Sequence, residues 1–226
     1  HMCCGIVIEE VTQQNAACYY GMVSLMDYHI GRILDTLEKT GQLDNTLIVF
    51  SSDHGDFLGD HGLWWKGAVA FEECMHVPCV VSYPGHVPAG TRSLALQSLV
   101  DLPPTFLDYL GVPIPAAMQG VCQRCAWENP EARMRDYVVV EERPHDSDFS
   151  ERFLITATHK LCVYYDRPYG ELYDMQHDPD QIENLWEDAA YAGLKMELLQ
   201  KLLQHEMNKG YPRPRASAFI APGEDA

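Results

Sequence analysis

The chain has 226 residues, and because 46% of them are hydrophobic it can bury a substantial core in one domain or two small ones. There are 33 acidic residues and 16 basic ones, and the resulting net charge of −17 argues against binding to nucleic acid or to anionic membranes. An anionic ligand would also be repelled at long range, so a site for one must concentrate positive charge locally.

The eight cysteines are scattered along the chain, and no apolar run approaches the roughly 20 residues that a membrane span requires. These features predict reduced thiols and a cytoplasmic protein. Cys122 and Cys125 form a single Cys-x-x-Cys pair without a second pair at zinc-ribbon spacing, so a structural metal or redox role is the less favoured interpretation.

The first predicted element is a helix from Ala17 to Lys39, where apolar residues recur at helical spacing and Lys39 and Gly41 supply the end signal. The preceding residues, Cys3 to Gln14, are interpreted as a lead-in to this helix, with a short strand as the alternative. Gly31 inside the helix costs about 1 kcal/mol relative to alanine, which predicts close packing against a sheet.

Leu47 to Phe50 is an apolar run that follows turn residues, and it predicts a buried strand in a mostly parallel sheet. Asp53 and His54 come just after it, and the carboxyl ends of such strands form ligand crevices. A carboxylate beside an imidazole offers two ligands to a divalent cation. The ammonium of Lys66 could neutralise charge on a sulfuryl or phosphoryl oxygen. From spacing alone, a solvated loop with a surface lysine is the alternative.

The stretch from Ser52 reads Ser-Asp-His-Gly-Asp-Phe-Leu-Gly-Asp-His-Gly-Leu-Trp-Trp-Lys-Gly. It resembles the second metal motif of the sulfatase family in the alkaline phosphatase superfamily, especially its sulfatase and phosphonate monoester hydrolase branch. The resemblance implies that Asp53 and His54 bind a divalent metal, expected to be Ca²⁺ with Mn²⁺ or Zn²⁺ as alternatives, and that Lys66 is catalytic and contacts the anionic group of the substrate. His76 stands where the family often carries Arg. It is interpreted either as a substrate-binding residue or as a structural histidine held by a hydrogen bond.

Farther along, Leu102 to Leu110 predicts a short helix with two prolines near its first turn. Three β-rich runs predict an antiparallel sheet: Tyr137 to Glu141, Arg152 to Thr158 and Lys160 to Tyr165. The segments after them are similar to the C-terminal signature of the family, in which a small sheet ends in a helix, here with its apolar face at Leu194 to Leu203. From Arg213 on, the composition predicts a loose tail.

The expected fold class is therefore α/β. A partial alkaline-phosphatase-like sulfatase sheet flanked by helices occupies residues 1–125, and a small antiparallel α+β subdomain with a C-terminal helix and tail occupies residues 126–226. The resemblance spans roughly residues 17–205 and is to the C-terminal half of a sulfatase.

The family takes its nucleophile from a Cys/Ser-x-Pro-x-Arg motif that matures to formylglycine, and no cysteine here has Pro two places on and Arg four places on. The implied function is metal-assisted hydrolysis of a sulfuric ester, with a phosphonate or phosphate ester as the alternative substrate. The competing hypothesis is a noncatalytic fragment or one half of a split protein. The isolated chain is expected to be inactive and to bind metal weakly or not at all, with Glu9 and Glu10 as the candidates to replace absent ligands. Its expected partners are a second copy or a missing N-terminal half, and neither nucleic acid nor membrane.

Overall fold

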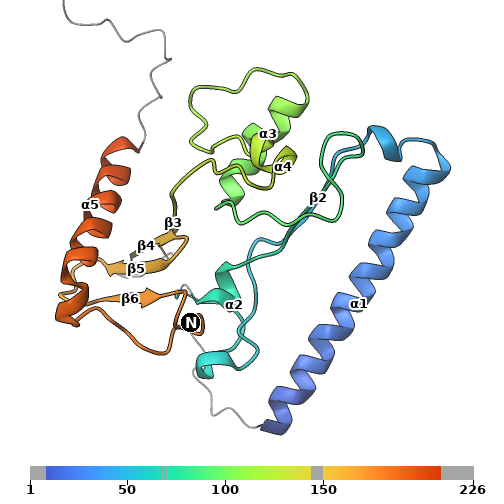
Figure 1. Cartoon of the computed structure of the whole chain (residues 1–226). Helices are drawn as coiled ribbons and strands as arrows, with labels where there is room; N and C mark the ends of the chain where they lie inside the picture. Colours follow the sequence, from blue (N-terminus) through green and yellow to red (C-terminus); the bar gives the residue numbers. More distant parts are fainter. Residues whose placement is uncertain (1–8, 68, 70, 144–149, 210–226) are drawn as a thin grey trace, which may run out of the picture.

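The computed structural model describes residues 9–67, 69, 71–143 and 150–209. It has three regions: a long N-terminal helix, a middle region around a two-stranded sheet, and a four-stranded sheet with one covering helix (Figure 1). The helices are α1 (Glu9–Lys39), α2 (Glu72–Met75), α3 (Leu102–Tyr109), α4 (Arg124–Glu128) and α5 (Ala192–Asn208). The strands are β1 (Ile48–Ser51), β2 (Cys79–Ser82), β3 (Tyr137–Glu142), β4 (Glu151–Thr156), β5 (His159–Tyr164) and β6 (Gly170–Asp174).

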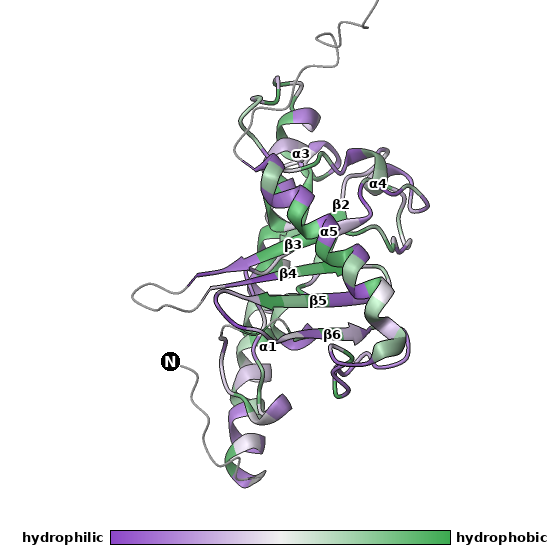
Figure 2. Cartoon of the chain, turned by 90° about the vertical axis from the view of Figure 1, so that its left-hand side faces the viewer, coloured by the Kyte–Doolittle hydropathy of each residue, from purple (hydrophilic) through white to green (hydrophobic). Residues whose placement is uncertain are grey.

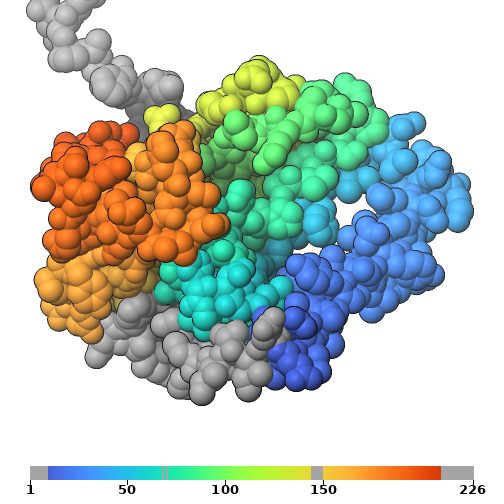
Figure 3. Space-filling view, turned by 60° about the horizontal axis from the view of Figure 1, so that its bottom comes forward, coloured from blue at the N-terminus to red at the C-terminus, as the bar shows by residue number. Residues whose placement is uncertain are grey.

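Helix α1 begins at Glu9, two turns earlier than the predicted start, and ends at Lys39. The close packing predicted at Gly31 is wrong, because a Cβ placed there would meet nothing within 4 Å. The helix lies apart from the other elements, and the space-filling view shows an opening between it and the segment that follows (Figure 3). Its surface carries large exposed apolar side chains: Val11, Tyr20, Met22, Val23, Leu25, Met26, Tyr28 and Ile33.

Strands β1 and β2 form an antiparallel pair, with Ile48 opposite Ser82 and Ser51 opposite Cys79. The prediction of a buried strand in a mostly parallel sheet is therefore wrong for the described residues. No third described strand pairs with these two, so their side chains are only partly covered and Phe50 and Val80 are exposed. The α/β class itself is confirmed, because the described elements combine helices with antiparallel sheets.

The predicted antiparallel sheet is confirmed, and its strands lie in the sequential order β3-β4-β5-β6. Because side chains alternate between the two faces of a strand, one face places Leu154, Leu161 and Leu172 against α5 (Figure 2). Leu198 and Leu202 of α5 complete this core. The opposite face carries Phe153 and Cys162, with Met75 of α2 packed against them.

Asp101 connects the two segments that flank α3. It is fully buried and accepts hydrogen bonds from the backbone N–H groups of Ser98 (2.9 Å) and Val121 (2.8 Å). The side chains of Gln123 (3.0 Å) and Arg135 also donate to it. The helix α3 that follows carries prolines in its first turn, as predicted.

The six cysteines in the described ranges are free, and the reduced state of the thiols stays a prediction. No described helix combines the length and apolar character needed to cross a bilayer. The lead-in residues before Glu9 and the predicted loose tail from Arg213 lie outside the described residues.

Candidate functional site

Asp53, His54 and Lys66, the three residues that the motif singled out, lie together where the chain leaves β1. The Oδ2 of Asp53 is 3.6 Å from the Nε2 of His54, and that nitrogen is 2.7 Å from the Nζ of Lys66. The Asp53 side chain is 84% exposed and that of His54 is 35% exposed, so the cluster opens to solvent. The structure thus brings the three side chains together, and the metal-binding and substrate-binding roles that the resemblance implies stay predictions.

The contacts of His54 determine its tautomer. The carbonyl of Gly55 can only accept, so the Nδ1–H of His54 donates to it over 2.7 Å. The Lys66 ammonium can only donate, so the Nε2 of His54 accepts from it. The Nε2 of His54, which faces Asp53, therefore carries the lone pair that a metal ligand requires. The hydrogen bond at Nδ1 fixes the orientation of the imidazole ring.

The carboxylate of Asp53 is held in its ionised form. Hydrogen bonds to backbone N–H groups, first that of Asp53 itself, lower the pKa of this carboxyl. One of these bonds comes from the N–H of His54 at 3.1 Å. Asp53 is thus an anionic oxygen donor at neutral pH.

A tight loop brings Lys66 back to His54. The N–H of Phe57 donates to the carbonyl of Trp65 at 2.9 Å, which closes the loop just before Lys66. Phe57 is 1% exposed and anchors the loop in the interior against Phe71. The turn passes through Gly59 with φ of 107°, a backbone conformation that favours glycine because it has no Cβ.

A second segment lies beside this loop. Ser51 pairs with Cys79, and farther along the N–H of Gly55 donates to the carbonyl of Cys74 at 2.8 Å. The segments that carry Asp53 and His76 are therefore held side by side between these two contacts. Any side chain at position 55 would collide, since an added Cβ would lie 1.8 Å from the carbonyl oxygen of Glu73.

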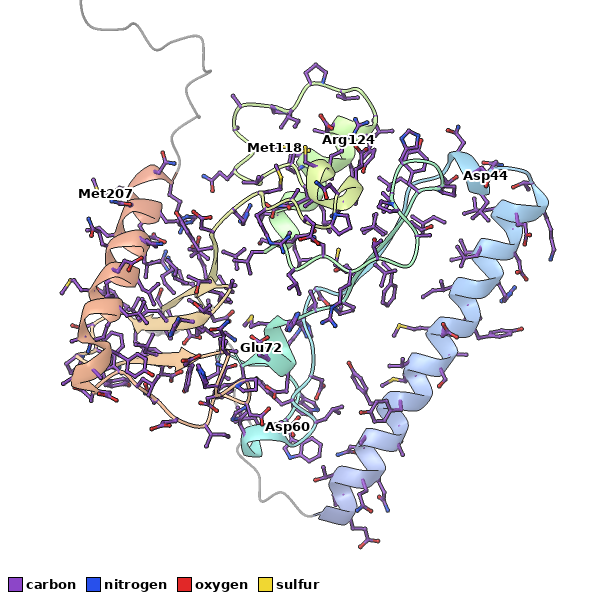
Figure 4. The ribbon with its side chains drawn as sticks, viewed as in Figure 1. Asp44, Asp60, Glu72, Met118, Arg124 and Met207 are labelled. Carbon is purple, nitrogen blue, oxygen red and sulfur yellow. The ribbon has the colours of Figure 1, made fainter. Side chains whose placement is uncertain are left out.

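His76 is exposed and is held by a hydrogen bond, as the structural interpretation expects, while its role in substrate binding stays a prediction. Its Nδ1 lies 2.8 Å from the Oε2 of Glu72 in α2. This hydrogen bond, against a smaller effect of burial, raises the pKa of His76. Figure 4 labels Glu72 at the junction between α2 and the C-terminal sheet, where it also contacts the buried Lys160.

Asp53 and His54 are ligands of a suitable type for a divalent cation, but they are fewer than such a cation requires. An ionised carboxylate and a neutral imidazole nitrogen are suitable ligands, whereas hard cations such as Ca²⁺ take about six or more oxygen ligands. In the described ranges no group of three or more His, Cys, Asp or Glu side chains is arranged to hold a metal. Glu10, one of the two suggested replacements, lies exposed on α1, and the side chain of Glu9 is outside the described set.

Sequence reasoning missed several residues that hold the two segments of the site in place. Phe57, Glu72 and Lys160 contribute to this, and sequence reasoning assigns none of them a role. Gly55 and Phe57 both lie inside the quoted motif, so they have a local signal, and an added Cβ at position 55 would collide with Glu73. The burial of Lys160 depends on strand pairing far along the chain and has no local signature.

Comparison with known proteins agrees with this geometry. The sulfatase family model matches residues 7–112. The chain is similar to the N-acetylglucosamine-6-O-sulfatase of Bacteroides thetaiotaomicron, with 38% identity over 88% of this chain and 36% of that protein. It is also 31% identical to the multifunctional alkaline phosphatase superfamily protein PehA of Trinickia caryophylli, over 87% of this chain and 41% of that protein.

Solved structures give the same result. One was determined in complex with its substrate D-glucosamine-2-N,6-O-disulfate, and it matches with a TM-score of 0.77 and 35% identity, over 84% of this chain and 40% of that one. The phosphonate monoester hydrolase of Agrobacterium radiobacter matches with a TM-score of 0.77 and 30% identity, over 85% of this chain and 41% of that one. The chain thus spans well under half the length of these relatives. By family match, sequence identity and fold, it belongs to the sulfatase family of the alkaline phosphatase superfamily.

Proposed function

We propose that this chain supplies one part of a metal-assisted site for hydrolysis of a sulfuric ester. The observation that carries the proposal is the convergence of Asp53, His54 and Lys66 within hydrogen-bonding or ion-pairing distance at the end of β1. Asp53 and His54 would hold a divalent cation, which would act there as a Lewis acid on an anionic ester oxygen.

Lys66 and His76 provide the positive charge that a chain of net charge −17 needs in order to receive an anionic ester. Lys66 is exposed, so its ammonium can turn from His54 toward a sulfuryl oxygen and stabilise charge that develops in the transition state. His76 adds a second cationic donor, because its pairing with Glu72 favours the imidazolium. Ca²⁺ is the metal we propose, with Mn²⁺ or Zn²⁺ as alternatives.

A phosphonate or phosphate monoester is the second candidate substrate. The support for it is the similarity to the phosphonate monoester hydrolase of Agrobacterium radiobacter and to PehA, described as multifunctional. Both ester classes present a tetrahedral anionic group, and the residues in this chain offer the same charges to either.

The isolated chain is expected to turn over neither a nitrophenyl sulfate nor a phenyl phosphonate. A covalent nucleophile divides a difficult displacement into two easier steps, and this sequence contains no Cys/Ser-x-Pro-x-Arg motif. Release of nitrophenol by the purified chain is the measurement. Turnover that disappears in Lys66→Ala would contradict this expectation and would show that the site is complete.

We further propose that the exposed apolar side chains of α1 pack against the portion of the sulfatase fold that the relatives carry outside the matched part. Support comes from the 60% or so of each solved relative that this chain does not cover. Contiguous apolar surface beyond a few hundred Å² is rarely left to solvent, and unpaired strand edges attract other chains. Met22 and Met26 on α1 are exposed, and β1 and β2 have no further described strand beside them.

When that portion is absent, the same surface is expected to drive self-association. The chain should sediment above the monomer mass at micromolar concentration, since the repulsion from its charge is screened within about 10 Å at ordinary salt. Replacing Met22 and Met26 by lysine should shift the chain toward monomer. Met196→Lys, at an equally exposed methionine on α5, is the matched control and should change nothing. A strict monomer that binds no apolar dye would contradict the proposal.

A further inference from the structure

A buried lysine of the C-terminal sheet lies directly behind the segment that carries His76. Lys160 on β5 is 1% exposed, and its Nζ is 2.5 Å from the Oε1 of Glu72 and 3.1 Å from the Oε1 of Gln181. Burial lowers the pKa of Lys160, and the charge of Glu72 opposes this change. An ammonium is costly to bury unless it is paired, so this contact holds Glu72 firmly against the sheet.

Gln181 closes the same cluster from a third segment. Its Oε1 also accepts the backbone N–H of Glu72 at 3.0 Å, so one amide oxygen binds both the lysine and the first residue of α2. Gln181 is 4% exposed and has a φ of 53°, a left-handed conformation that is uncommon for a residue with a side chain. A conformation of this kind persists only where the surrounding structure holds it in place.

The other carboxylate oxygen of Glu72 faces the candidate site. Its Oε2 receives His76 at 2.8 Å, while its Oε1 receives Lys160. Burial alone would raise the pKa of Glu72, but the hydrogen bond from His76 and the charge of Lys160 outweigh it and lower the pKa to about 2. Glu72 is thus one carboxylate shared between a buried cation and an exposed one.

We propose that Lys160 is a positioning residue for the candidate site: by clamping Glu72 it fixes the orientation of His76 and keeps this imidazole available as a cation for the anionic ester. The same clamp holds α2, whose Cys74 carbonyl receives the N–H of Gly55 next to the Asp53–His54 pair. The C-terminal sheet therefore acts on the site through α2, without touching the substrate. This inference rests on the proposed anion-binding role of His76.

The test is an NMR titration of the His76 imidazole in the full chain that carries Lys160→Met. This substitution removes the ammonium and keeps an unbranched apolar side chain. Glu72 raises the pKa of His76 through a hydrogen bond and through its charge, while Lys160 and Arg92 lower it less strongly. If Lys160 holds Glu72 in place, its loss releases the partly exposed carboxylate to solvent. The pKa of His76 then falls toward its ordinary value of 6.5.

Glu72→Gln gives the largest expected fall in the pKa of His76, because it removes the carboxylate that pairs with this imidazole. Adding Lys160→Met to Glu72→Gln should produce little further change. Lys201→Met is the matched control: this lysine pairs with Glu197 on α5 at 3.2 Å, and its removal should leave His76 unaffected. If Lys160→Met does not fold, Gln181→Leu removes the shared acceptor from the other side and must lower the pKa of His76 as well.

A His76 pKa that is unchanged or raised in Lys160→Met overturns the proposal, because it would show that Glu72 keeps its place without the lysine. The measurement does not depend on turnover or on metal. The expected shift therefore supports the clamp whether or not the proposed hydrolysis holds.

Discussion

Glu151→Gln is expected to stabilise this protein at neutral and alkaline pH. Glu151 opens β4, is 1% exposed, and neither of its carboxylate oxygens has a hydrogen-bond partner in the part of the chain that is described. Burial, followed by the negative charges of Glu142 and Glu171, raises the pKa of this carboxyl to about 8. The folded chain therefore keeps Glu151 protonated at pH values where the unfolded chain ionises it.

The direction of the pH dependence of stability follows from the difference in proton binding between the folded and the unfolded chain. Below the ordinary pKa of 4.5, both the folded and the unfolded chain hold the proton, and Glu151 has no effect on the pH dependence. Between that value and about 8, the unfolded chain releases the proton first, so stability falls as pH rises. Glutamine has the shape of the protonated acid and does not titrate. The advantage of Glu151→Gln should thus grow by about 3 kcal/mol between about pH 5.5 and about pH 8.

Denaturant unfolding of both proteins at several pH values measures this difference. Glu183→Gln, at an exposed position, is the control and is expected to change stability by no more than about 0.5 kcal/mol. A gap between Glu151→Gln and the parent that stays constant with pH would mean that the Glu151 carboxylate is solvated or paired after all.

Asp101→Asn is expected to be among the most destabilising single substitutions in the chain. Asp101 is fully buried and accepts hydrogen bonds from Ser98, Val121, Gln123 and Arg135. The substitution replaces one acceptor oxygen by an N–H₂ group and removes the charge opposite Arg135, whose side chain is only 16% exposed. Breaking a buried pair by removing one partner costs about 3–5 kcal/mol.

A matched comparison comes from Asp108, which also pairs with an arginine. Its Oδ2 is 3.3 Å from Arg124, but the two side chains are 40% and 37% exposed. Pairs that are this open to solvent contribute about 0–1 kcal/mol, so Asp108→Asn should be mild. Equal losses of unfolding free energy in the two variants would contradict the argument that burial makes Asp101 costly to replace.

The local patterns predicted the C-terminal sheet well, and the three motif residues also lie close together, in both cases for physical reasons. The strands around Leu154 and Leu161 are runs rich in apolar and β-branched residues, and both of their faces are covered, so the composition of each run reports its burial directly. Asp53, His54 and Lys66 lie within one short loop, and a loop closed by Phe57 and its own backbone is specified locally.

The errors concern surfaces whose partners are not local. Gly31 predicts close packing, yet no described residue lies against α1 at this position. A helical pattern alone does not show which other surface will cover the helix. Leu47 to Phe50 looked like a buried parallel strand because its residues are apolar, whereas its one described neighbour is the antiparallel β2. Lys160 was read simply as part of a strand, because its partner Glu72 is distant in sequence.

Metal binding at Asp53 and His54 tests the central claim most directly, and Mn²⁺ is a suitable probe because its unpaired electrons broaden nearby NMR signals. Because Asp53 and His54 are the two suitable ligands among the described residues, we predict weak binding, with a Kd of about 10⁻³ M or higher. Broadening should centre on residues 53–55 and be lost in Asp53→Asn. Asp174 and His177 form another acid–imidazole pair, 2.9 Å apart, so Asp174→Asn is the control and should leave the broadening in place. Broadening that survives Asp53→Asn, or that centres away from residues 53–55, would contradict the account.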